Sequence, residues 1–284
     1  SRPVPDADPG QTGTVPGQSA ADGTVLLRVW DGEQVVEMTM AEYLPGVVRG
    51  EMPASFHQQA LDAQAVAERT FICYHMASGR KAEHPDADVC MDYHCCNAYT
   101  SAQAVRDTDG QVILYNGQPI LAAFHSSSAG VTANSGDVWV STLPYLHSVK
   151  SPEGEGSVPN YYSVRELPAA EFQQTFLAAH PEASFAGAPE TWITGRTENA
   201  SGRVETVTIG GITVEGTEVR SLYGLRSACF TAEAAADRVT FHVTGFGHGV
   251  GMSQYGANQL AAEGKTWQDI LHWYYTDVTI GLYG

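Results

Sequence analysis

Three residues with metal-binding side chains, His84, Cys90 and Cys96, lie at even steps in one short stretch, HPDADVCMDYHCC. The stretch begins 33 residues after Glu51, which stands in a Gly-Glu-Met-Pro segment. Imidazole and thiolate ligands gathered so closely are typical of zinc. A carboxyl group on a corner flanked by glycine and proline is suited to proton transfer. Together the two features predict an enzyme.

The kind of zinc site is left open by the spacing. His84, Cys90 and Cys96 as the only protein ligands would leave one tetrahedral position open, as in reactive zinc. His94 or Cys95 as a fourth ligand would close a structural site, although vicinal cysteines rarely direct both sulfurs at one ion. The alternative is a disulfide with a spare thiol, because the odd count of five cysteines excludes complete pairing.

Glu51 also has two interpretations. Standing between Gly50 and Pro53, where one predicted helix ends before the next, it is poorly placed for an ordinary solvated charge on a helix face. It could instead favour the N-terminus of the following helix by about 0.3–1 kcal/mol. The sequence around it decides between these only when other motifs are added.

Two further segments carry polar side chains suited to a ligand. His125 and Ser126 in FHSSSAG are adjacent at the exit of a predicted strand, so they point to opposite faces and are unsuited to act as a base and nucleophile pair. We predict that they bind substrate instead.

The glycine-rich segment GFGHGVG, residues 245–251, is not a dinucleotide fingerprint, because Val250 stands where GxGxxG needs glycine. Nor is GMSQYG a nucleophile elbow, because Tyr255 replaces the second glycine. We predict backbone that a sugar chain can approach, with His248, Ser253, Gln254 and Tyr255 as hydrogen-bonding groups and aromatic platform. A tight strand-to-helix turn is the alternative.

Turn residues and capping signals predict the elements around these motifs. Hairpins are expected in residues 25–38, at Asn116-Gly117 between QVILY and PILAAF, and in residues 203–215. Thr39 with Glu42 opens a helix toward Val48, and Ser55 with Gln58 opens a longer helix to about residue 78. Near the C-terminus, helices are expected over 253–263 and from the Thr266 and Asp269 cap onward.

This order of strands and helices lacks a regular βαβ rhythm and predicts an α+β fold, with hairpins and helices around a substrate cleft. Residues 1–24 are interpreted as a flexible leader and 25–284 as one domain, in which the less patterned residues 151–202 are an insertion or small subdomain. Cys73 and Cys229, in apolar surroundings, are expected to be buried thiols.

Composition narrows the class of protein. The 284 residues are 43% hydrophobic and 10% aromatic, which favours a folded globule. A net charge of −17 without a basic stripe argues against nucleic acid as a partner. No apolar run is long enough to span a membrane. We expect an extracytoplasmic domain whose membrane anchor or secretion signal precedes the printed sequence.

The motifs, taken in order, resemble the stage II sporulation protein D family. They are EYLPGVVRGEMPASFHQQALDAQAVAERTF, FHSSSAGVT, PYLHSVKSP and GFGHGVGMSQYGANQLAAEGKTWQDILHWYY, and together they extend over most of residues 39–276. The resemblance implies a membrane-anchored lytic transglycosylase of peptidoglycan that faces the cell wall and acts in spore engulfment. Wall amidases and other membrane-anchored sporulation proteins are its expected partners.

The resemblance also implies roles for single residues. The glutamate of the family's Gly-Glu-Met-Pro motif is the catalytic acid, and it falls on Glu51. The arginine of the following helix falls on Arg69, where it could bind a muramyl carboxylate. The zinc site of some members resembles His84, Cys90 and Cys96. Residues 151–202 depart from the family pattern, which leaves cleft candidates there, such as Tyr161 and Tyr162, in doubt.

The chemistry of such an enzyme agrees with a single carboxyl group. A lytic transglycosylase uses one acid and base to cleave the glycan and to close a 1,6-anhydro ring, so it needs no second carboxylate. Two rival functions stay open. A zinc amidase or hydrolase would use the metal to activate water, and a wall-binding scaffold would only recruit partners.

Overall fold

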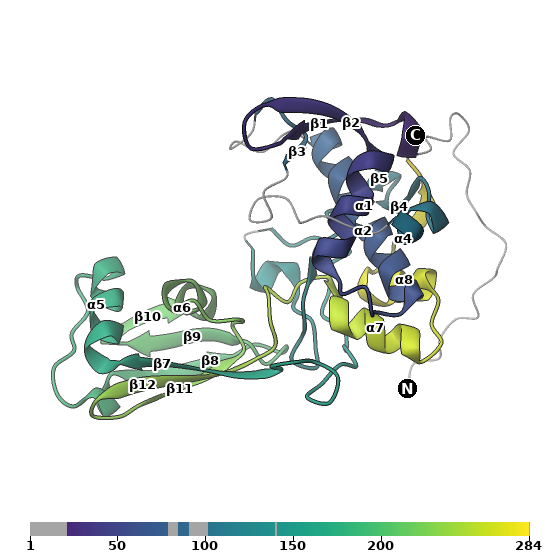
Figure 1. Cartoon of the computed structure of the whole chain (residues 1–284). Coiled ribbons are helices and arrows are strands. Elements are labelled where there is room, and N and C mark those ends of the chain that lie inside the picture. Colours follow the sequence, from purple (N-terminus) through teal and green to yellow (C-terminus); the bar gives the residue numbers. More distant parts are fainter. Residues whose placement is uncertain (1–21, 79–84, 91–101, 140, 284) are drawn as a thin grey trace. The chain divides into compact units, whose positions relative to one another are not determined.

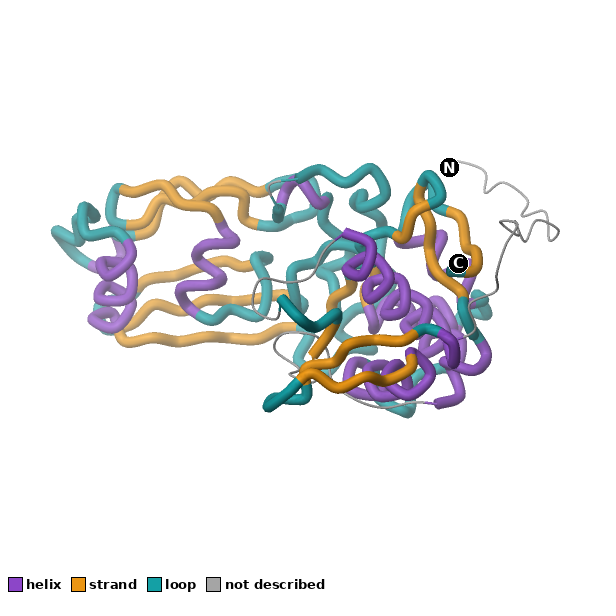
Figure 2. The backbone as a smooth tube through the Cα atoms, turned by 90° about the horizontal axis from the view of Figure 1, so that it is seen from above, coloured by secondary structure: helices purple, strands orange, loops and turns teal. Residues whose placement is uncertain are grey.

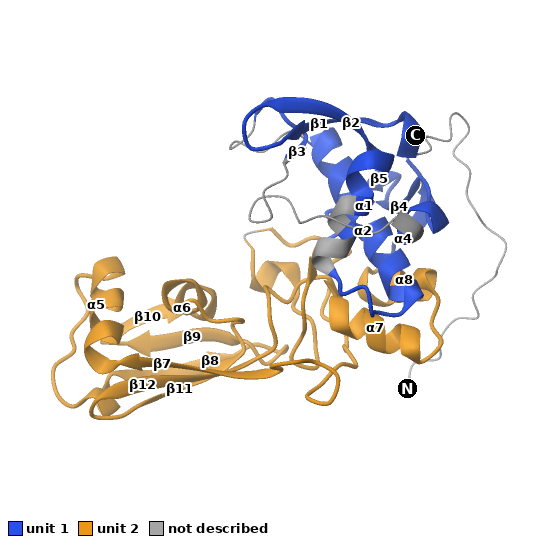
Figure 3. Ribbon diagram, viewed as in Figure 1, with its two compact units in different colours: residues 1–122, 277–284 blue, residues 123–276 orange. Residues whose placement is uncertain are grey.

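The computed structural model describes residues 22–78, 85–90, 102–139 and 141–283, and the chain forms two compact units (Figure 1, Figure 3). Unit 1 comprises residues 1–122 and 277–284, and unit 2 comprises residues 123–276. Both mix helices with small sheets, which confirms the predicted α+β class. The substrate cleft stays a prediction. Within the described residues, each helix is too short or too polar to cross a lipid bilayer.

Unit 1 begins with a hairpin at the predicted place. Strands β1 (Leu26–Trp30) and β2 (Val35–Thr39) pair antiparallel, and the Asp31 carboxylate in the turn accepts backbone N–H groups of Glu33 and Gln34 at 2.8 and 2.9 Å. The short strand β3 (Val89–Cys90) joins β1 in parallel. The leader was predicted to extend to residue 24, but Asp22–Thr24 form a 3-10 helix, η1, in which Asp22 is buried.

Helix α1 (Met40–Glu51) starts at the predicted capping box, in which Thr39 and Glu42 exchange hydrogen bonds. It continues three residues beyond the predicted end at Val48, passing through Pro45. A proline removes only one backbone donor, and the buried side chains of Leu44 and Val48 keep this helix packed. The chain becomes extended only at Met52.

Helix α2 (Gln58–Ser78) begins three residues later than the predicted cap at Ser55. His57 precedes it, and its carbonyl accepts the N–H groups of Ala60 and Leu61. Alanines let neighbouring backbones approach α2 on most sides, as the composition predicted, and thirteen of its residues are buried. It packs on α1, on α4 (Ala102–Asp107) and on β4 (Gln111–Tyr115).

A second hairpin closes unit 1. Asn116 and Gly117 have positive φ angles of 51° and 76°, which suits the tight turn that the sequence predicted between β4 and β5 (Gln118–Pro119). Strand β5 is shorter than predicted, because the chain leaves this sheet after Pro119. Strand β14 (Thr279–Leu282) pairs antiparallel with β4, so the last strand of the chain belongs to the first unit.

Most of unit 2 is a two-sheet body (Figure 2). One sheet has the order β11-β12-β7 and the other the order β10-β9-β8. A single apolar core, which includes Phe172, Phe176, Tyr223 and Phe241, joins these sheets with α5 and α6. The bounds are β7 (Tyr162–Pro168), α5 (Ala169–Ala179), β8 (Ile193–Glu198), β9 (Val204–Ile209), β10 (Ile212–Glu215), α6 (Gly216–Tyr223), β11 (Phe230–Ala234) and β12 (Arg238–Thr244).

The segment 151–202 does not fold by itself. Its strand β7 pairs with β12 along seven residues, and β8 pairs with β9, so residues up to 244 complete the same body. The predicted hairpin at Gly210 and Gly211 joins β9 to β10. Short 3-10 helices, η2 (Ser135–Asp137) and η3 (Pro189–Thr191), lie in the connecting segments.

The C-terminal part of unit 2 follows the sequence closely. After β13 (Met252–Ser253), helix α7 (Gln254–Ala262) is capped by Ser253, whose hydroxyl oxygen accepts the N–H of Gly256 at 3.2 Å. Helix α8 (Trp267–Tyr274) starts at a capping box of Thr266 and Asp269. Both helices lie where the sequence predicted them, and the second starts at the predicted cap.

Candidate functional site

Two of the predicted binding segments meet in unit 2. Strand β6 (Phe124–His125) pairs in parallel with β13, so that His125 lies opposite Ser253. The pairing is extended by a hydrogen bond from the N–H of Tyr255 to the carbonyl of Ser126, 3.1 Å long. Residues more than a hundred positions apart in the sequence thus form one site in the fold.

His125 is buried, and both of its ring nitrogens bond within the protein. Nδ1 lies 3.2 Å from the carbonyl oxygen of Val250, and Nε2 lies 2.6 Å from Oγ of Ser128. Because a carbonyl can only accept, Nδ1 carries the proton, and Nε2 accepts from the Ser128 hydroxyl. Burial, followed by the neighbouring His248, holds the pKa of His125 well below its usual range, so the ring stays neutral.

The partner of His125 is Ser128 rather than the adjacent Ser126. A bend after β6 carries Ser128 back to the ring, a contact that strand alternation does not predict. Ser128 is fully buried, with no exposed surface, so a substrate cannot reach its hydroxyl in this arrangement. The pair therefore has the hydrogen bond of a Ser–His hydrolase without its accessibility.

Glu153 is a buried residue of this site that the sequence did not single out. Its Oε1 accepts the N–H of Ser128 at 2.6 Å and also the hydroxyl of Ser253. The residue is only 3% exposed, although glutamate is seldom buried without a partner. Glu153 follows the predicted motif PYLHSVKSP directly, but nothing in that spacing indicates contacts to residues 25 and 100 positions away.

His248 is held in the glycine-rich turn. Its Nδ1 accepts the N–H of Val250 at 3.0 Å, and its ring lies 5.3 Å from that of Trp139. Burial, with additional repulsion from Arg220 and Arg203, lowers the pKa of His248 to about 4. The ring is therefore neutral near pH 7. Its side chain is partly exposed.

The glycines of this turn serve close packing. A Cβ at Gly249 would lie 2.0 Å from the guanidinium of Arg203, and one at Gly251 would lie 2.0 Å from the carbonyl oxygen of Ala123. Both positions have positive φ angles, which glycine adopts without strain. At these two glycines the structure therefore shows the tight turn that was the alternative interpretation, and not backbone open to a ligand.

The other predicted contact residues of unit 2 differ in exposure. Ser253 and Gln254 are buried, whereas Ser126 and Tyr255 keep partly exposed side chains. Of the two aromatic candidates outside the motifs, Tyr161 is buried and Tyr162 is 58% exposed on β7.

Arg69 lies inside unit 1, where it is 1% exposed. Its Nε and Nη2 donate to the two carboxylate oxygens of Asp22 at 2.8 and 2.7 Å, and Nη1 donates to the carbonyl of Gln111 at 2.9 Å. This guanidinium is thus occupied by groups of the protein, and the geometry does not support the predicted contact with a substrate carboxylate.

The remaining predicted residues are described only in part. Glu51 is the last residue of α1, so its backbone lies at the C-terminal end of that helix rather than at the start of α2, and its side chain lies outside the described residues. Cys90 ends β3, opposite Trp30. His84 and Cys96 lie outside the described residues, and the part that is described contains no cluster of three or more potential metal ligands.

Cys73 and Cys229, which lie outside the stretch predicted to bind zinc, are free. Cys73 is buried in α2, and burial raises the pKa of its thiol to about 12. Cys229 is partly exposed rather than buried, and it donates to the carbonyl of Gly202 at 3.1 Å. A thiol that holds its proton so firmly as Cys73 is a poor metal ligand.

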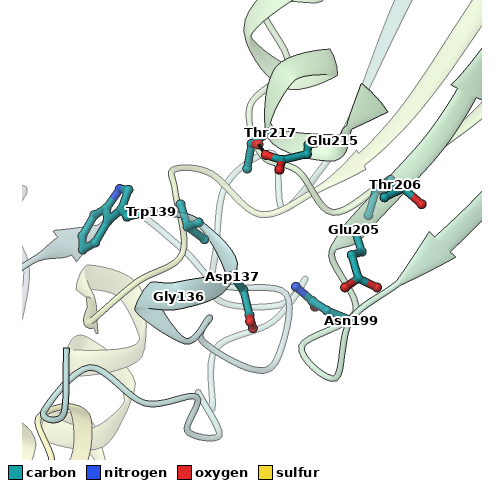
Figure 4. Close-up of a pocket in the computed structure, with 10 residues that line it drawn as sticks. Gly136, Asp137, Trp139, Asn199, Glu205, Thr206, Glu215 and Thr217 are labelled. Atoms are coloured by element: carbon teal, nitrogen blue, oxygen red, sulfur yellow. Dashed lines mark hydrogen bonds between the residues drawn. The ribbon is translucent and has the colours of Figure 1, made fainter. Parts of the chain in front are cut away.

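A cavity of about 470 Å³ lies in unit 2 next to this site (Figure 4). Trp139, whose ring contacts His248, is one of its lining residues. Figure 4 shows Asn199, Glu205 and Thr206 along one side and Asp137 across from them. The lining consists of Gly136, Asp137, Val138, Trp139, Asn199, Val204, Glu205, Thr206, Glu215 and Thr217. Carboxylate, amide and hydroxyl groups beside an indole suit a ligand with many hydroxyl groups.

Comparison with known proteins decides the family. Residues 31–115 match the family described as Stage II sporulation protein. Stage II sporulation protein D of Bacillus subtilis is 40% identical over 267 residues, which cover 87% of this chain and 76% of that protein. The chain belongs to the stage II sporulation protein D family. The namesake protein of Bacillus amyloliquefaciens is 37% identical and covers 87% of the chain.

A more distant relative has a different name. The Amidase enhancer of Bacillus subtilis is 29% identical over 295 residues, which cover 84% of this chain but 40% of that larger protein. The family resemblance predicted from the motifs is therefore confirmed, together with a context of sporulation and the cell wall. The names themselves specify neither a reaction nor a metal.

Proposed function

We propose that this protein is a lytic transglycosylase that cleaves peptidoglycan between N-acetylmuramic acid and N-acetylglucosamine during spore engulfment. Membership of the family supports this proposal. The observation that carries it is the position of Glu51 at the C-terminal end of α1. The partial negative charge of a helix C-terminus disfavours an ionised carboxylate, which suits a residue that must arrive protonated.

In the proposed reaction Glu51 acts twice. Its carboxyl group first gives its proton to the bridging oxygen, and the bond from that oxygen to the muramyl C1 breaks. The resulting carboxylate then takes the proton of the muramyl 6-hydroxyl, whose oxygen bonds to C1 and closes the 1,6-anhydro ring. The residue ends as it began, so a single carboxyl group is sufficient and water is not consumed.

Unit 2 supplies the proposed contacts to the glycan chain. Ser126, His248 and Tyr255 keep partly exposed side chains, and the cavity beside Trp139 extends the polar and aromatic surface. His125 and Ser253 are buried, so we assign them to shaping this surface from behind. Neutral histidines are appropriate there, because they hydrogen bond without adding a charge.

We further propose that zinc is bound by His84, Cys90 and Cys96. The donor set suits this ion, and the described part of the structure is compatible with it, since burial keeps the Cys73 thiol protonated and the Cys229 thiol donates to a backbone carbonyl. Cys90 ends a strand of the sheet that leads into α1, which would place the ion on a rigid element of unit 1. When bound, zinc would link the segment before β3, which carries His84, to the segment after it, which carries Cys96.

The proposed setting is the outer face of the membrane, with glycan strands as substrate. A wall amidase and membrane-anchored sporulation proteins are the proposed partners, and the relative named Amidase enhancer supports the first of these. That name also favours a second candidate function, in which the protein binds the wall and stimulates an amidase without cleaving glycan.

The variant Glu51→Gln tests the proposal. We expect release of 1,6-anhydromuramyl products from purified glycan strands to fall by about 100-fold or more, because the amide has no proton to give. Mass spectrometry of the products is the measurement. Glu37→Gln, at an exposed position of β2, is the matched control and should keep full activity.

The same product analysis separates the rival functions. Anhydromuramyl ends released equally by Glu51→Gln would contradict the mechanism. Free stem peptides with glycan chains of unchanged length would indicate an amidase. Binding without any change in the glycan, combined with stimulation of an added amidase, would indicate the enhancer.

A further inference from the structure

The buried carboxylate of Glu153 joins three separate segments of unit 2. Its Oε1 accepts from the N–H of Ser128 and from the hydroxyl of Ser253, and Oε2 is buried with no hydrogen-bond partner among the described residues. We propose that Glu153 is a positioning residue that sets the glycan-binding surface formed by Ser126 and Tyr255. This inference rests on the proposed function, because it assigns a task within glycan binding.

The two donors lie just behind that surface. Ser128 follows the exit of β6, and Ser253 ends β13 and caps α7 through the N–H of Gly256 at 3.2 Å. Between them, the N–H of Tyr255 bonds to the carbonyl of Ser126 at 3.1 Å. One carboxylate oxygen of Glu153 thus bonds to both segments that are joined by this hydrogen bond. The partly exposed side chains of Ser126 and Tyr255 belong to these two segments.

Glu153 is itself fixed by its own segment. The N–H of Ser151 donates to the carbonyl of Gly130 at 3.0 Å, and the Ser151 hydroxyl lies 2.7 Å from the hydroxyl of Tyr274 in α8. We call the Glu153 carboxylate with its two donors, Ser128 and Ser253, the clamp. These contacts of Ser151 hold the clamp in place, because a mobile carboxylate could not define the spacing of its two donors.

The first turn of α7 is fitted against the same carboxylate. A Cβ at Gly256 would come within 2.6 Å of Oε2 of Glu153 and 2.0 Å of the Tyr274 hydroxyl. Glycine is therefore required at this position for the helix to approach. Gly256, the second glycine of GMSQYG, is explained by the close approach of the helix to Tyr274, Ser151 and Glu153.

The clamp also reaches the His125 ring. Glu153 fixes the backbone of Ser128, and the hydroxyl of the same Ser128 donates to Nε2 of His125 at 2.6 Å. Loss of the carboxylate should release Ser128 and change the hydrogen bond at Nε2. Because Glu153 is 3% exposed, it acts through these neighbours and not on the substrate.

The test compares Glu153→Ala, Glu153→Gln and the matched control Glu155→Ala, which changes an exposed residue two positions along. Each is made in the Glu51→Gln protein, so that binding is measured without cleavage. The probe is a tetrasaccharide of alternating N-acetylglucosamine and N-acetylmuramic acid, and the readout is its Kd by calorimetry.

We expect the Kd to rise about tenfold for Glu153→Ala, because two hydrogen bonds to a charged acceptor are lost. For Glu153→Gln it should stay within about threefold, since the amide oxygen can still accept from both donors. The control should bind like the parent. Unchanged binding by a folded Glu153→Ala protein overturns the proposal, as does Glu153→Gln that binds as weakly as Glu153→Ala.

A second measurement needs no ligand. The imidazole ¹⁵N spectrum of Glu153→Ala should show the Nε2 signal of His125 shifted toward that of an unbonded nitrogen, whereas the control spectrum should not change. An unshifted signal overturns the clamp. If the parent protein binds no glycan and the Glu153→Ala variant still shows this shift, the proposed function is refuted and the clamp stands.

If Glu153→Ala does not fold, Glu153→Asp replaces it. The shorter side chain withdraws the carboxylate by one methylene, so it cannot reach both Ser128 and Ser253. Binding between that of the parent and a tenfold loss supports the clamp, and binding equal to the parent overturns it.

Discussion

In unit 1 the buried carboxylate of Asp22 forms an ion pair with Arg69, whereas in unit 2 the buried carboxylate of Glu153 accepts hydrogen bonds, among the described residues, from a backbone N–H and a hydroxyl. The Asp22–Arg69 pair crosslinks the start of the unit to its central helix and to β4. The Glu153 contacts join segments that carry the predicted binding residues. An ion pair of this kind secures a fold, and dipolar donors around a carboxylate set the geometry of a surface.

The variant Asp22→Ala tests the role of the ion pair in unit 1, and we expect it to have the largest effect on stability. The variant leaves the Arg69 guanidinium buried and without its carboxylate, which should lower the free energy of unfolding of unit 1 by about 3–5 kcal/mol. Urea unfolding followed by circular dichroism measures the loss. Removal of the exposed Asp86 carboxylate is the control and should change stability by less than about 0.5 kcal/mol.

A second variant shows whether the charge itself is responsible. Asp22→Ala combined with Arg69→Met removes both charges, so much of the lost stability should return. Equal losses in the single and the double variant would mean that packing, rather than an uncompensated charge, accounts for the effect. The buried carboxylate of unit 1 would then stabilise the protein through packing and hydrogen bonds, as that of unit 2 does, and not through its charge.

What sequence could predict follows the range of the interactions. The turn at Asn116 and Gly117 and the caps at Thr39 and Thr266 depend on residues three or four positions apart, and all were predicted correctly. Such local chemistry does not depend on the rest of the fold.

Apart from the local cap predicted at Ser55, the misses come from contacts across the fold. The Asp22 end of the leader is ordered because it meets Arg69, 47 positions away. Glu153 is part of the site because it meets Ser128 and Ser253, a relation that no spacing rule contains. Conversely, Arg69 was predicted to bind substrate from its place in a motif, and its burial could not be seen from the motif alone.

Substitution of Asp62 in unit 1 should have the next largest effect on stability. It should stabilise the protein, because the charged form of a buried acid lowers stability. Burial raises the pKa of Asp62 from 3.8 to about 6, against opposing hydrogen bonding from Gln58. A raised folded-state pKa stabilises the protein below pH 3.8 relative to higher pH, and this contribution is lost as the pH rises through 6. Asp62→Asn should therefore stabilise unit 1 by about 2 kcal/mol at pH 7, since the neutral amide avoids that cost but loses one of the two acceptor oxygens used by Gln58 and Gln59.

Urea unfolding at pH 7 and pH 4 checks this prediction. The gain should nearly vanish at pH 4, where the carboxyl group is mostly protonated in the folded protein and the difference between the side chains is small. A gain of equal size at both pH values would assign the effect to packing or helix propensity. Asp86→Asn, which changes an exposed acid, should produce neither the gain nor its pH dependence.

His248 in unit 2 should make stability change with pH in the opposite direction to Asp62, over nearly the same pH range. Its folded-state pKa of about 4 lies below the value of 6.5 for an exposed histidine, chiefly because of burial and then because of Arg220 and Arg203. Stability is complete above pH 6.5 and falls as the pH drops toward 4, because the unfolded chain takes up the proton first. We expect a loss of about 2 kcal/mol after allowance for partial exposure of the ring. His248→Asn retains an acceptor for the N–H of Val250 and should remove this dependence of stability on pH, as measured by urea unfolding from pH 7 to pH 4.

Acidification should weaken unit 2 relative to unit 1, because protonation of Asp62 stabilises the folded protein over the pH range in which protonation of His248 destabilises it. Hydrogen exchange in β12 should therefore rise before exchange in α2. The reverse order would show that the ion pair, and not the neutral histidine turn, is the acid-sensitive part of the molecule.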